Sequence, residues 1–282
     1  MSVLDGVGMR GLRVRRVRGA MAYPDDANGA PRGPVTGAAW LVLPTFDEAE
    51  NLERMVAAVL PVLEHAAGDL GYRVLVVDDD SPDGTGAIAD RLAAEHPGIV
   101  EVLHRTDRQG LGPAYLAGFA RALEGGAGLV LEMDCDFSHD PRDLARLIAA
   151  ARGGADLALG SRYVRHGAVA DWGLLRRFIS RGGSAYAGAV LRLPVKDLTG
   201  GFKCFRREVL EAIDLPTVRS HGYAFQVELT LRAARSGFRI VEVPITFRDR
   251  ENGYSKMSWK IAAEAVWLVP ALRGWKPDTA RR

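Results

Sequence analysis

The sequence predicts an α/β fold in which one mainly parallel sheet lies between helices. From residue 38 onward, short apolar runs alternate with longer segments of helical periodicity, and the runs have the length of buried strands. Repeats of strand, helix and strand favour a parallel sheet with right-handed crossovers. Polar and acidic residues follow the ends of several runs. This placement suggests a site, because ligands of such sheets bind at the carboxyl ends of the strands.

The predicted elements follow one another in order. Buried strands are predicted at residues 39–43, 73–77, 99–103, 129–133 and 156–159. Helices are predicted between them, at residues 48–67, 85–96, 113–124 and 141–151. The first helix, with a kink expected at Pro61, has one apolar face made of Leu52, Met55, Val56, Val59 and Leu63. One apolar face is what a helix needs to cover a sheet.

Composition excludes several classes of protein. The chain has 282 residues, enough for one large domain or two small ones. Its 37 basic and 35 acidic residues give a net charge of +2, so we expect no nucleic-acid partner. Two cysteines, Cys135 and Cys204, are too few for a disulfide-stapled scaffold and favour a reducing compartment. No apolar run approaches the roughly 20 residues of a membrane-spanning helix, and we expect no signal peptide.

Three regions are expected along the chain. Residues 1–37 include five arginines within residues 10–18 and then a stretch rich in Pro, Gly, Asp and Asn. This region is expected to be a disordered tail, and contact with an anionic membrane is the alternative. Residues 38–258 form the predicted globular domain. Residues 259–282 carry a predicted amphipathic helix and tail, which either lies on a bilayer surface or packs against the domain.

The best candidates for metal ligands are Asp134 and Asp136, which flank Cys135 directly after a predicted strand. If this segment is extended, both carboxylates point to the same side. Their hard oxygens suit Mg²⁺ or Mn²⁺, which keep positions open for phosphate oxygens. Cys135, pointing the other way, is expected to pack inside the protein. The alternative is that these acids cap the next helix, which has the start signal Asp140-Pro141.

Three further acids, Asp78, Asp79 and Asp80, follow the second predicted strand. One interpretation is that they are turn and helix-capping residues. This structural role is the expectation for a fourth acid, Asp83, which precedes Gly84. The carboxylate of Asp79 is instead a candidate acceptor of hydrogen bonds from a base or a ribose. That role needs an acceptor but no metal.

A series of motifs then runs in order between about residues 38 and 260. The motifs are PTFDE at 44–48, VDDDSPDGT at 77–85, GLGPA at 110–114, EMDCDFSH at 132–139, GSRY at 160–163, ISRG at 179–182, DLTGGFK at 197–203, YAFQVE at 223–228, EVPITF at 242–247 and GYSK at 253–256. Together they resemble the motifs of the polyprenol-phosphate (dolichol-phosphate) mannose synthases. Several motifs are long and their order is kept, so a chance match is implausible.

The resemblance implies a nucleotide-diphospho-sugar transferase fold of the GT-A type, in family-two glycosyltransferases. Residues 38–258 would then be the catalytic domain. The implied reaction transfers mannose from GDP-mannose, with inversion, to a polyprenyl phosphate in the presence of Mg²⁺ or Mn²⁺. A lipid acceptor implies an enzyme at the membrane surface, peripheral at the cytoplasmic face, alone or beside a separate or fused membrane protein.

The resemblance also implies roles for individual residues. The guanosine would be held by Pro44, Phe46, Glu48, Val77 and Asp79. The sugar nucleotide would lie along Asp134, Cys135 and Asp136, with the metal on Asp134 and Asp136 and Ser138 as a weaker third ligand. The diphosphate would face Lys203, Arg250 and Lys256. The acceptor phosphate would face Arg162, Arg176 and Ser180.

Charge explains why such a site needs both a cation and arginines. The donor diphosphate and the acceptor phosphate bring several negative charges into one cleft, and guanidinium groups suit phosphate geometry. A phosphate monoester with a second pKa of about 6 is mostly dianionic at pH 7. Its oxygen is therefore already a nucleophile, and no general base is expected. Without the resemblance, Arg162 and Arg176 would be interpreted as ordinary surface charges, although Arg176 and Ser180 share one helical face.

Four positions depart from the pattern of this family. Asp47 stands where Asn is common, Asp80 where Gly is common, Cys135 where Ala is common and Lys203 where Arg is common. Asp80 adds a side chain beside a ligand-facing turn, and Lys203 lacks the two-pronged geometry of Arg. These departures bear on donor affinity rather than on the fold.

Three other functions are compatible with parts of the sequence. A signalling receiver module is suggested by the acids at 78–80, but it does not explain Asp134 and Asp136. A polyprenyl-phosphate glucosyltransferase using UDP-glucose is the nearest rival, because base and sugar contacts come from loops. An inactive sugar-nucleotide-binding scaffold is compatible with Asp80 and Lys203.

Overall fold

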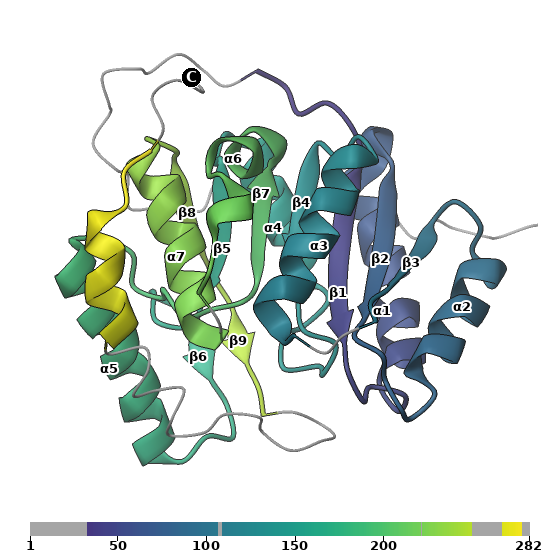
Figure 1. The fold of residues 1–282 in the computed structure, drawn as a ribbon, viewed down its shortest axis with the longest axis horizontal. Helices are drawn as coiled ribbons and strands as arrows, with labels where there is room; N and C mark the ends of the chain where they lie inside the picture. The colour runs from purple at the N-terminus through teal and green to yellow at the C-terminus, as the bar shows by residue number, and fades with distance from the viewer. Residues whose placement is uncertain (1–32, 107–108, 221, 250–266, 278–282) are drawn as a thin grey trace, which may run out of the picture.

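The computed structural model describes residues 33–106, 109–220, 222–249 and 267–277 (Figure 1). A seven-stranded sheet forms its centre, and a two-stranded sheet accompanies it. The strands are β1 (Ala39–Thr45), β2 (Tyr72–Asp78), β3 (Val100–His104), β4 (Leu129–Glu132), β5 (Leu157–Ser161), β6 (Ala168–Val169), β7 (Lys203–Arg206), β8 (Ile240–Pro244) and β9 (Thr246–Phe247). The helices are α1 (Leu52–Ala67), α2 (Thr85–Glu95), α3 (Leu111–Glu124), α4 (Asp143–Arg152), α5 (Leu174–Leu191), α6 (Arg207–Ala212) and α7 (Gly222–Arg235), with 3-10 turns η1 (Gly68–Leu70), η2 (Leu215–Thr217) and η3 (Leu272–Gly274).

The main sheet has the strand order β3-β2-β1-β4-β7-β5-β8. Strands β1 to β4 pair in parallel, as do β5 and β8, whereas β7 runs antiparallel to both β4 and β5. The prediction of a mainly parallel sheet is therefore confirmed. The short strands β6 and β9 form the second sheet.

Helices cover both faces of the sheet. Side chains alternate between the two faces along each strand, and in this sheet both faces are apolar. Leu41 of β1 belongs to a core shared with α1, α2 and α4, whereas Val42 belongs to a core shared with α3, α5, α6 and α7. In Figure 1, α3 and α7 lie in front of the sheet and α1 and α4 behind it. Helix α3 comes close to β1 because Gly118 has no side chain: a Cβ there would lie 2.4 Å from Cγ1 of Val42.

The strands and helices predicted between residues 39 and 161 are all present, with ends that differ by a few residues. The predicted apolar face of α1 is buried, and α1 runs through Pro61. This helix begins at Leu52 rather than at Glu48. The carbonyl of Glu48 instead accepts hydrogen bonds from the backbone N–H groups of Asn51 and Leu52.

Both ends of the described chain contact the domain. Nη1 of Arg206 donates to the Gly33 carbonyl over 2.9 Å, and Val35 packs against the core, so contacts begin before residue 38. Toward the C-terminus, Val269 is buried and Nη1 of Arg235 donates to the Trp275 carbonyl over 2.6 Å. Most of the Arg-rich tail, residues 1–32, and residues 250–266 lie outside the described residues. Within the described ranges, no helix has both the length and the apolarity needed to cross a membrane.

Candidate active site

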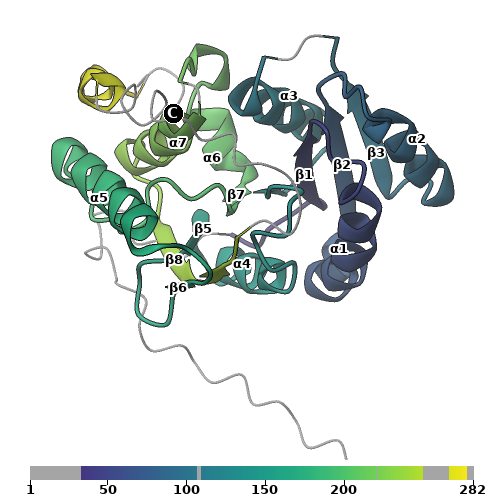
Figure 2. The ribbon, with the colours of Figure 1, turned by 90° about the horizontal axis from the view of Figure 1, so that it is seen from below.

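The loops that follow β1, β2 and β4 meet at one edge of the main sheet. These strands are parallel neighbours, with Thr45 opposite Asp78 and Val42 opposite Glu132, so their carboxyl ends lie side by side. Figure 2 views the molecule from this edge. Ligands of open α/β sheets bind at this edge, and the acids singled out in the sequence follow these strands.

Asp78 supports the loops beneath the site. Its carboxylate is buried, and its Oδ1 accepts hydrogen bonds from Oγ1 of Thr45 (3.1 Å) and Oγ of Ser81 (2.6 Å). The backbone N–H of Asp79 donates to the Thr45 carbonyl over 3.1 Å. Asp78 therefore connects the end of β1 to the turn after β2.

Asp83 has the structural role predicted for it. Its Oδ1 accepts from the backbone N–H of Thr85 (3.0 Å) and from Oγ1 of Thr85 (2.6 Å), at the start of α2. Its Oδ2 accepts from the backbone N–H of Ala49 over 3.0 Å. Burial raises the pKa of Asp83, but these hydrogen bonds outweigh it and hold the pKa below its ordinary value.

Asp79 is buried and paired with Arg105. Nη1 of Arg105 donates to Oδ1 of Asp79 over 2.5 Å, and Nη2 of Arg105 donates to Oε1 of Gln109 over 3.2 Å. Burial raises the pKa of Asp79, although the guanidinium acts in the opposite direction. Arg105 was not among the residues predicted from the sequence. It lies two residues after the predicted strand at 99–103 and directly after β3, so the pattern of polar residues at strand ends also applies to it.

The other predicted guanosine residues lie at different depths. Pro44 and Val77 are buried, and the Val77 side chain faces the core under α3, so it has no surface for a ligand. Any contact of Val77 with a nucleoside would use its backbone. Phe46 and Glu48 are half-buried beyond the end of β1, and Oε2 of Glu48 accepts from Nδ2 of Asn51 over 2.8 Å.

The segment after β4 bends rather than continuing as an extended strand. Oδ1 of Asp136 accepts from the backbone N–H of Ser138 over 3.0 Å, and Phe137 has a φ of 58°. Oδ1 of Asp134 accepts from the hydroxyl of Tyr115 over 3.1 Å. The bend includes Cys135, so the assumption that residues 134–136 are extended was wrong. The prediction that Cys135 packs inside the protein is confirmed: it is 2% exposed, and burial raises the pKa of its thiol.

The residues after β4 suit a divalent cation. Besides the carboxylates of Asp134 and Asp136, the segment holds Oγ of Ser138, which is buried and makes no hydrogen bond within the described chain. An unsatisfied buried oxygen is costly, so it calls for a partner. Among the described residues, no three His, Cys, Asp or Glu side chains converge as an all-protein metal cage. Two carboxylates and a hydroxyl fit Mg²⁺ or Mn²⁺, which retain water or phosphate ligands.

Lys203 lies in the interior rather than at a ligand surface. It is 0% exposed, and its Nζ donates to Oε1 of Glu132 over 3.1 Å and also to Oε1 of Gln226. Burial raises the pKa of Glu132 and lowers the pKa of Lys203, although each charge favours the other. The expectation that Lys203 faces a diphosphate is not met in this arrangement, because its ammonium is enclosed by β4 and α7.

Arg162 is also held within the protein. Its Nε donates to Oδ2 of Asp197 and its Nη2 to Oδ1 of Asp197, each over 2.7 Å, and the backbone N–H of Arg162 donates to the same carboxylate. The guanidinium lies over the rings of Tyr163, Trp172 and Phe247. With 6% of the residue exposed, this bidentate pair corrects the expectation of an open acceptor-phosphate contact.

Arg176 and Ser180 share one face of α5, as predicted. Nη1 of Arg176 donates to Oδ1 of Asp249 over 3.0 Å, and its guanidinium lies 4.1 Å from the centre of the Trp172 ring. Oγ of Ser180 accepts from the hydroxyl of Tyr163 over 2.7 Å. The Arg176 side chain is 31% exposed, so it can reach a ligand. Arg250 and Lys256 lie outside the described residues.

Comparison with known proteins identifies the family. A family model described as "Glycosyl transferase family 2" matches residues 40–214. The chain belongs to this family. The glycosyltransferase is 49% identical to "Polyprenol monophosphomannose synthase" of Mycolicibacterium smegmatis. The alignment of 243 residues covers 86% of this chain and 89% of that protein. It is 48% identical to "Undecaprenyl-phosphate mannosyltransferase" of Micrococcus luteus, over 80% of this chain and 89% of that protein.

A solved structure supports the fold. The mannosyltransferase of Pyrobaculum calidifontis, in complex with GDP-Man and Mn²⁺, superposes on this glycosyltransferase with a TM-score of 0.60 at 20% identity, covering 88% of this chain and 68% of that one. Together with the family model, this similarity confirms the predicted nucleotide-diphospho-sugar transferase fold of the GT-A type.

Two departures noted in the sequence have a common backbone cause. Asp47 has a φ of 55° and Asp80 a φ of 58°, so both lie in the left-handed region. Gly and Asn adopt this region at low cost, and Asp is among the few other residues that tolerate it. In the glycosyltransferase, Asp80 thus keeps the turn after β2, and its exposed side chain points away from the core.

Proposed function

We propose that this glycosyltransferase transfers mannose from GDP-mannose to a polyprenyl phosphate, with inversion, giving polyprenyl-phosphate mannose and GDP. The single observation that carries the proposal is the 49% identity to the M. smegmatis relative across 86% of the chain. The name of that relative states both the sugar and the class of acceptor. The M. luteus relative, at 48% identity, names the same two.

The donor side of the proposed site is the edge formed by the loops after β1, β2 and β4. Asp134, Asp136 and Ser138 would hold Mg²⁺ or Mn²⁺, and the bound cation would offset charge on the diphosphate and on the departing GDP. Asp79, Phe46 and Glu48 would contact the guanosine. Asp79 lies next to Arg105, whose guanidinium keeps the carboxylate and its loop in place.

Other donor contacts follow from the resemblance. The backbone at Pro44, Val77 and Cys135 would complete the donor contacts, because these side chains are buried. Arg250 and Lys256 would face the diphosphate.

The acceptor side is proposed at Arg176 and Ser180. A guanidinium and a hydroxyl on one face of α5 can together bind a phosphate monoester. An oxygen of that phosphate attacks C1 of mannose, the bond from C1 to the diphosphate oxygen breaks, and GDP leaves with the electron pair. The acceptor oxygen is already deprotonated, so the residues position charged groups and remove no proton. Arg162, paired with Asp197, would support this side through Tyr163, which it contacts.

A polyprenyl acceptor places the enzyme at a membrane surface. We propose peripheral attachment at the cytoplasmic face, alone or beside a membrane protein. The proposal draws support from α5, which exposes Phe178 (77%) and Ile179 (49%) close to Arg176 and Ser180. Residues 259–266 of the predicted amphipathic segment lie outside the described residues, and the described part packs against the domain through Val269.

One transfer assay tests the proposal against its rivals. The protein is incubated with labelled GDP-mannose or UDP-glucose, Mg²⁺ or Mn²⁺ and a polyprenyl phosphate, and label in the lipid phase is counted. We expect label from GDP-mannose only, and none when the acceptor is left out. Label from UDP-glucose would favour the glucosyltransferase. Tight nucleotide binding without any transfer would favour an inactive scaffold.

A further inference from the structure

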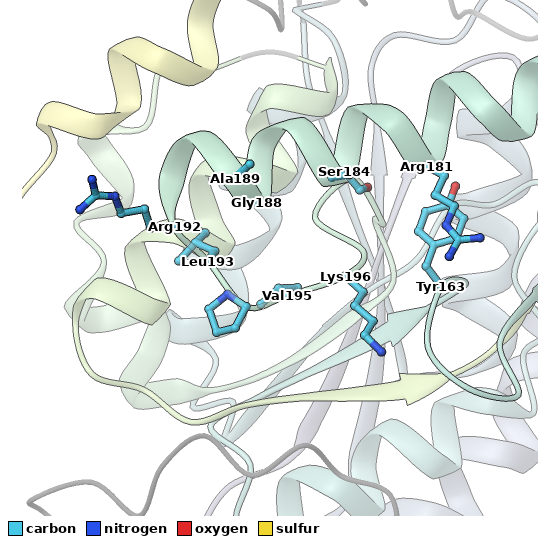
Figure 3. Close-up of a pocket in the computed structure, with 11 residues that line it drawn as sticks. Tyr163, Arg181, Ser184, Gly188, Ala189, Arg192, Leu193, Val195 and Lys196 are labelled. Atoms are coloured by element: carbon cyan, nitrogen blue, oxygen red, sulfur yellow. The ribbon is translucent and has the colours of Figure 1, made fainter.

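A groove of about 840 Å³ runs along the C-terminal half of α5, apart from the donor edge (Figure 3). One wall is the face of α5 that carries Gly188 and Ala189, and the other is the segment that follows the helix, with Leu193 and Val195. Small side chains on α5 leave this space open. The floor of the groove is apolar, because Gly and Ala of α5 face Leu193 and Val195 across it.

The rim of the groove is cationic. Arg181, Arg192 and Lys196 line it, and all three are exposed. Among the described residues that line the groove, none is acidic. The carboxylate of Glu242 lies outside the lining of the groove and accepts hydrogen bonds from the backbone N–H groups of Lys196 (3.0 Å) and Asp197 (3.1 Å), so it anchors the wall. Three cations around an apolar floor suit an amphiphile with a negative head.

The same helix exposes large apolar side chains that do not line the groove, and these indicate what kind of amphiphile binds. Phe178, Ile179 and Tyr186 of α5 are 77%, 49% and 36% exposed. An exposed apolar group beside cations is typical of a surface that lies on a bilayer, where rings enter the interface and cations meet lipid phosphates. A free phosphate would use the cations but leave the apolar floor and these side chains in water.

We propose that the groove binds an anionic phospholipid of the membrane, with its phosphodiester between Arg181 and Lys196 and its chains over the apolar floor toward Arg192 at the other end. This inference rests on the proposed function, because it names the membrane component that would seat the enzyme beside its lipid acceptor. Tyr163 connects the two sites: its ring lines the groove, and its hydroxyl donates to Oγ of Ser180. A lipid in the groove would thus stabilise the residue that orients Ser180.

Vesicle binding by the full chain tests the proposal without any turnover. Sedimentation with phosphatidylcholine vesicles is compared with sedimentation with mixed phosphatidylcholine and phosphatidylglycerol vesicles. We expect tighter binding to the mixed vesicles and a loss of about fivefold per cation removed, since each basic residue near such a surface contributes about 1 kcal/mol. The double variant Arg181→Gln/Lys196→Gln should therefore lose roughly 25-fold. The control is Arg91→Gln, which removes a guanidinium from α2 at the opposite edge of the sheet.

A second variant keeps the test decisive if the double variant unfolds. Ala189→Glu adds a carboxylate to an exposed position in the groove and should also weaken binding to the mixed vesicles. Equal binding of wild type, Ala189→Glu and the double variant would overturn the proposal. So would binding that requires polyprenyl phosphate, because the groove would then serve the acceptor. Failure of mannose transfer would leave these vesicle results unaffected, so the two claims fail separately.

Discussion

The hydroxyl of Tyr115 donates a hydrogen bond to Oδ1 of Asp134 over 3.1 Å, joining α3 to the segment after β4. The Tyr115 ring is fully buried and stacks on Phe225, with ring centres 6.2 Å apart and planes 6° apart. Burial and the nearby carboxylates raise the pKa of Tyr115 well above its ordinary value, so the hydroxyl keeps its proton and remains a donor. A rigid donor of this kind holds one oxygen of a proposed metal ligand in place.

Tyr115→Phe should weaken Mn²⁺ binding by about tenfold or more, because loss of a group that orients a ligand typically costs 10- to 100-fold in metal affinity. The ring and its stacking are kept, so the melting temperature should change little. Mn²⁺ binding by electron paramagnetic resonance, with GDP present, measures the effect. Tyr72→Phe, on half-buried Tyr72 at the start of β2, is the matched control. Unchanged Mn²⁺ affinity in Tyr115→Phe would show that the hydrogen bond is only structural.

Asp136→Ala should lower the rate of mannose transfer by at least about 100-fold, since charge stabilisation by a bound metal contributes several kcal/mol. Cys135→Ala is its neighbour control. The Cys135 side chain is buried, and only its backbone is proposed to contact the donor, so this variant should keep most of the activity. Rates under saturating donor and acceptor decide the matter. Retained activity in Asp136→Ala would refute the metal assignment.

Arg162 and Arg176 should respond differently to substitution. Arg162→Gln leaves the buried carboxylate of Asp197 without its bidentate partner, so the free energy of unfolding should fall by about 3–5 kcal/mol. Arg176→Gln affects a partly exposed side chain and should change stability by less than about 0.5 kcal/mol. Its KM for the acceptor should rise about tenfold or more, with the KM for GDP-mannose unchanged. A stable Arg162→Gln with a raised acceptor KM would instead show that Arg162 binds the phosphate.

Lys203→Met should lower the free energy of unfolding by about 3–5 kcal/mol, because it leaves the buried carboxylate of Glu132 without its cation. The double variant Lys203→Met/Glu132→Leu removes both charges and should recover most of that loss. Denaturant unfolding of the single and double variants makes the comparison. If Lys203→Met is fully stable but binds GDP weakly, Lys203 turns outward and contacts the donor.

Asp83→Ala should lower the free energy of unfolding by about 1–2 kcal/mol at pH 7, through loss of the hydrogen bonds at the start of α2. The folded-state pKa of Asp83 lies below its ordinary value of 3.8. Its stabilising contribution is therefore complete above about pH 4 and is lost as pH falls through the lower folded-state value. The difference between wild type and variant should shrink at that acidic end. A difference that stays constant down to pH 2 would contradict the pKa shift.

Local pattern was sufficient for much of the fold and for the site's acids. Buried strands such as residues 39–43 and 73–77 are largely apolar runs, and Asp79, Asp134 and Asp136 lie within three residues of the end of such a run. The antiparallel insertion of β7 between β4 and β5 could not be predicted in this way, because pairing between distant segments leaves no local period.

The burial of the cations was hidden for a similar reason. Lys203 pairs with Glu132, 71 positions away in the sequence, and Arg162 pairs with Asp197, 35 positions away. Neither pair is therefore visible as a local sequence pattern. The resemblance assigned both cations to ligands, whereas the structure pairs them with buried acids. Arg105 was not predicted because its partner Asp79 lies 26 residues away, although its place after β3 matches that of the acids after β2 and β4.

A crystal structure with GDP and Mn²⁺ would show whether the acids after β4 hold the metal. The account predicts the ion on the carboxylates of Asp134 and Asp136, with the diphosphate beside it and the guanosine toward Asp79. A nucleotide bound elsewhere, or an ion that contacts neither aspartate, would contradict it.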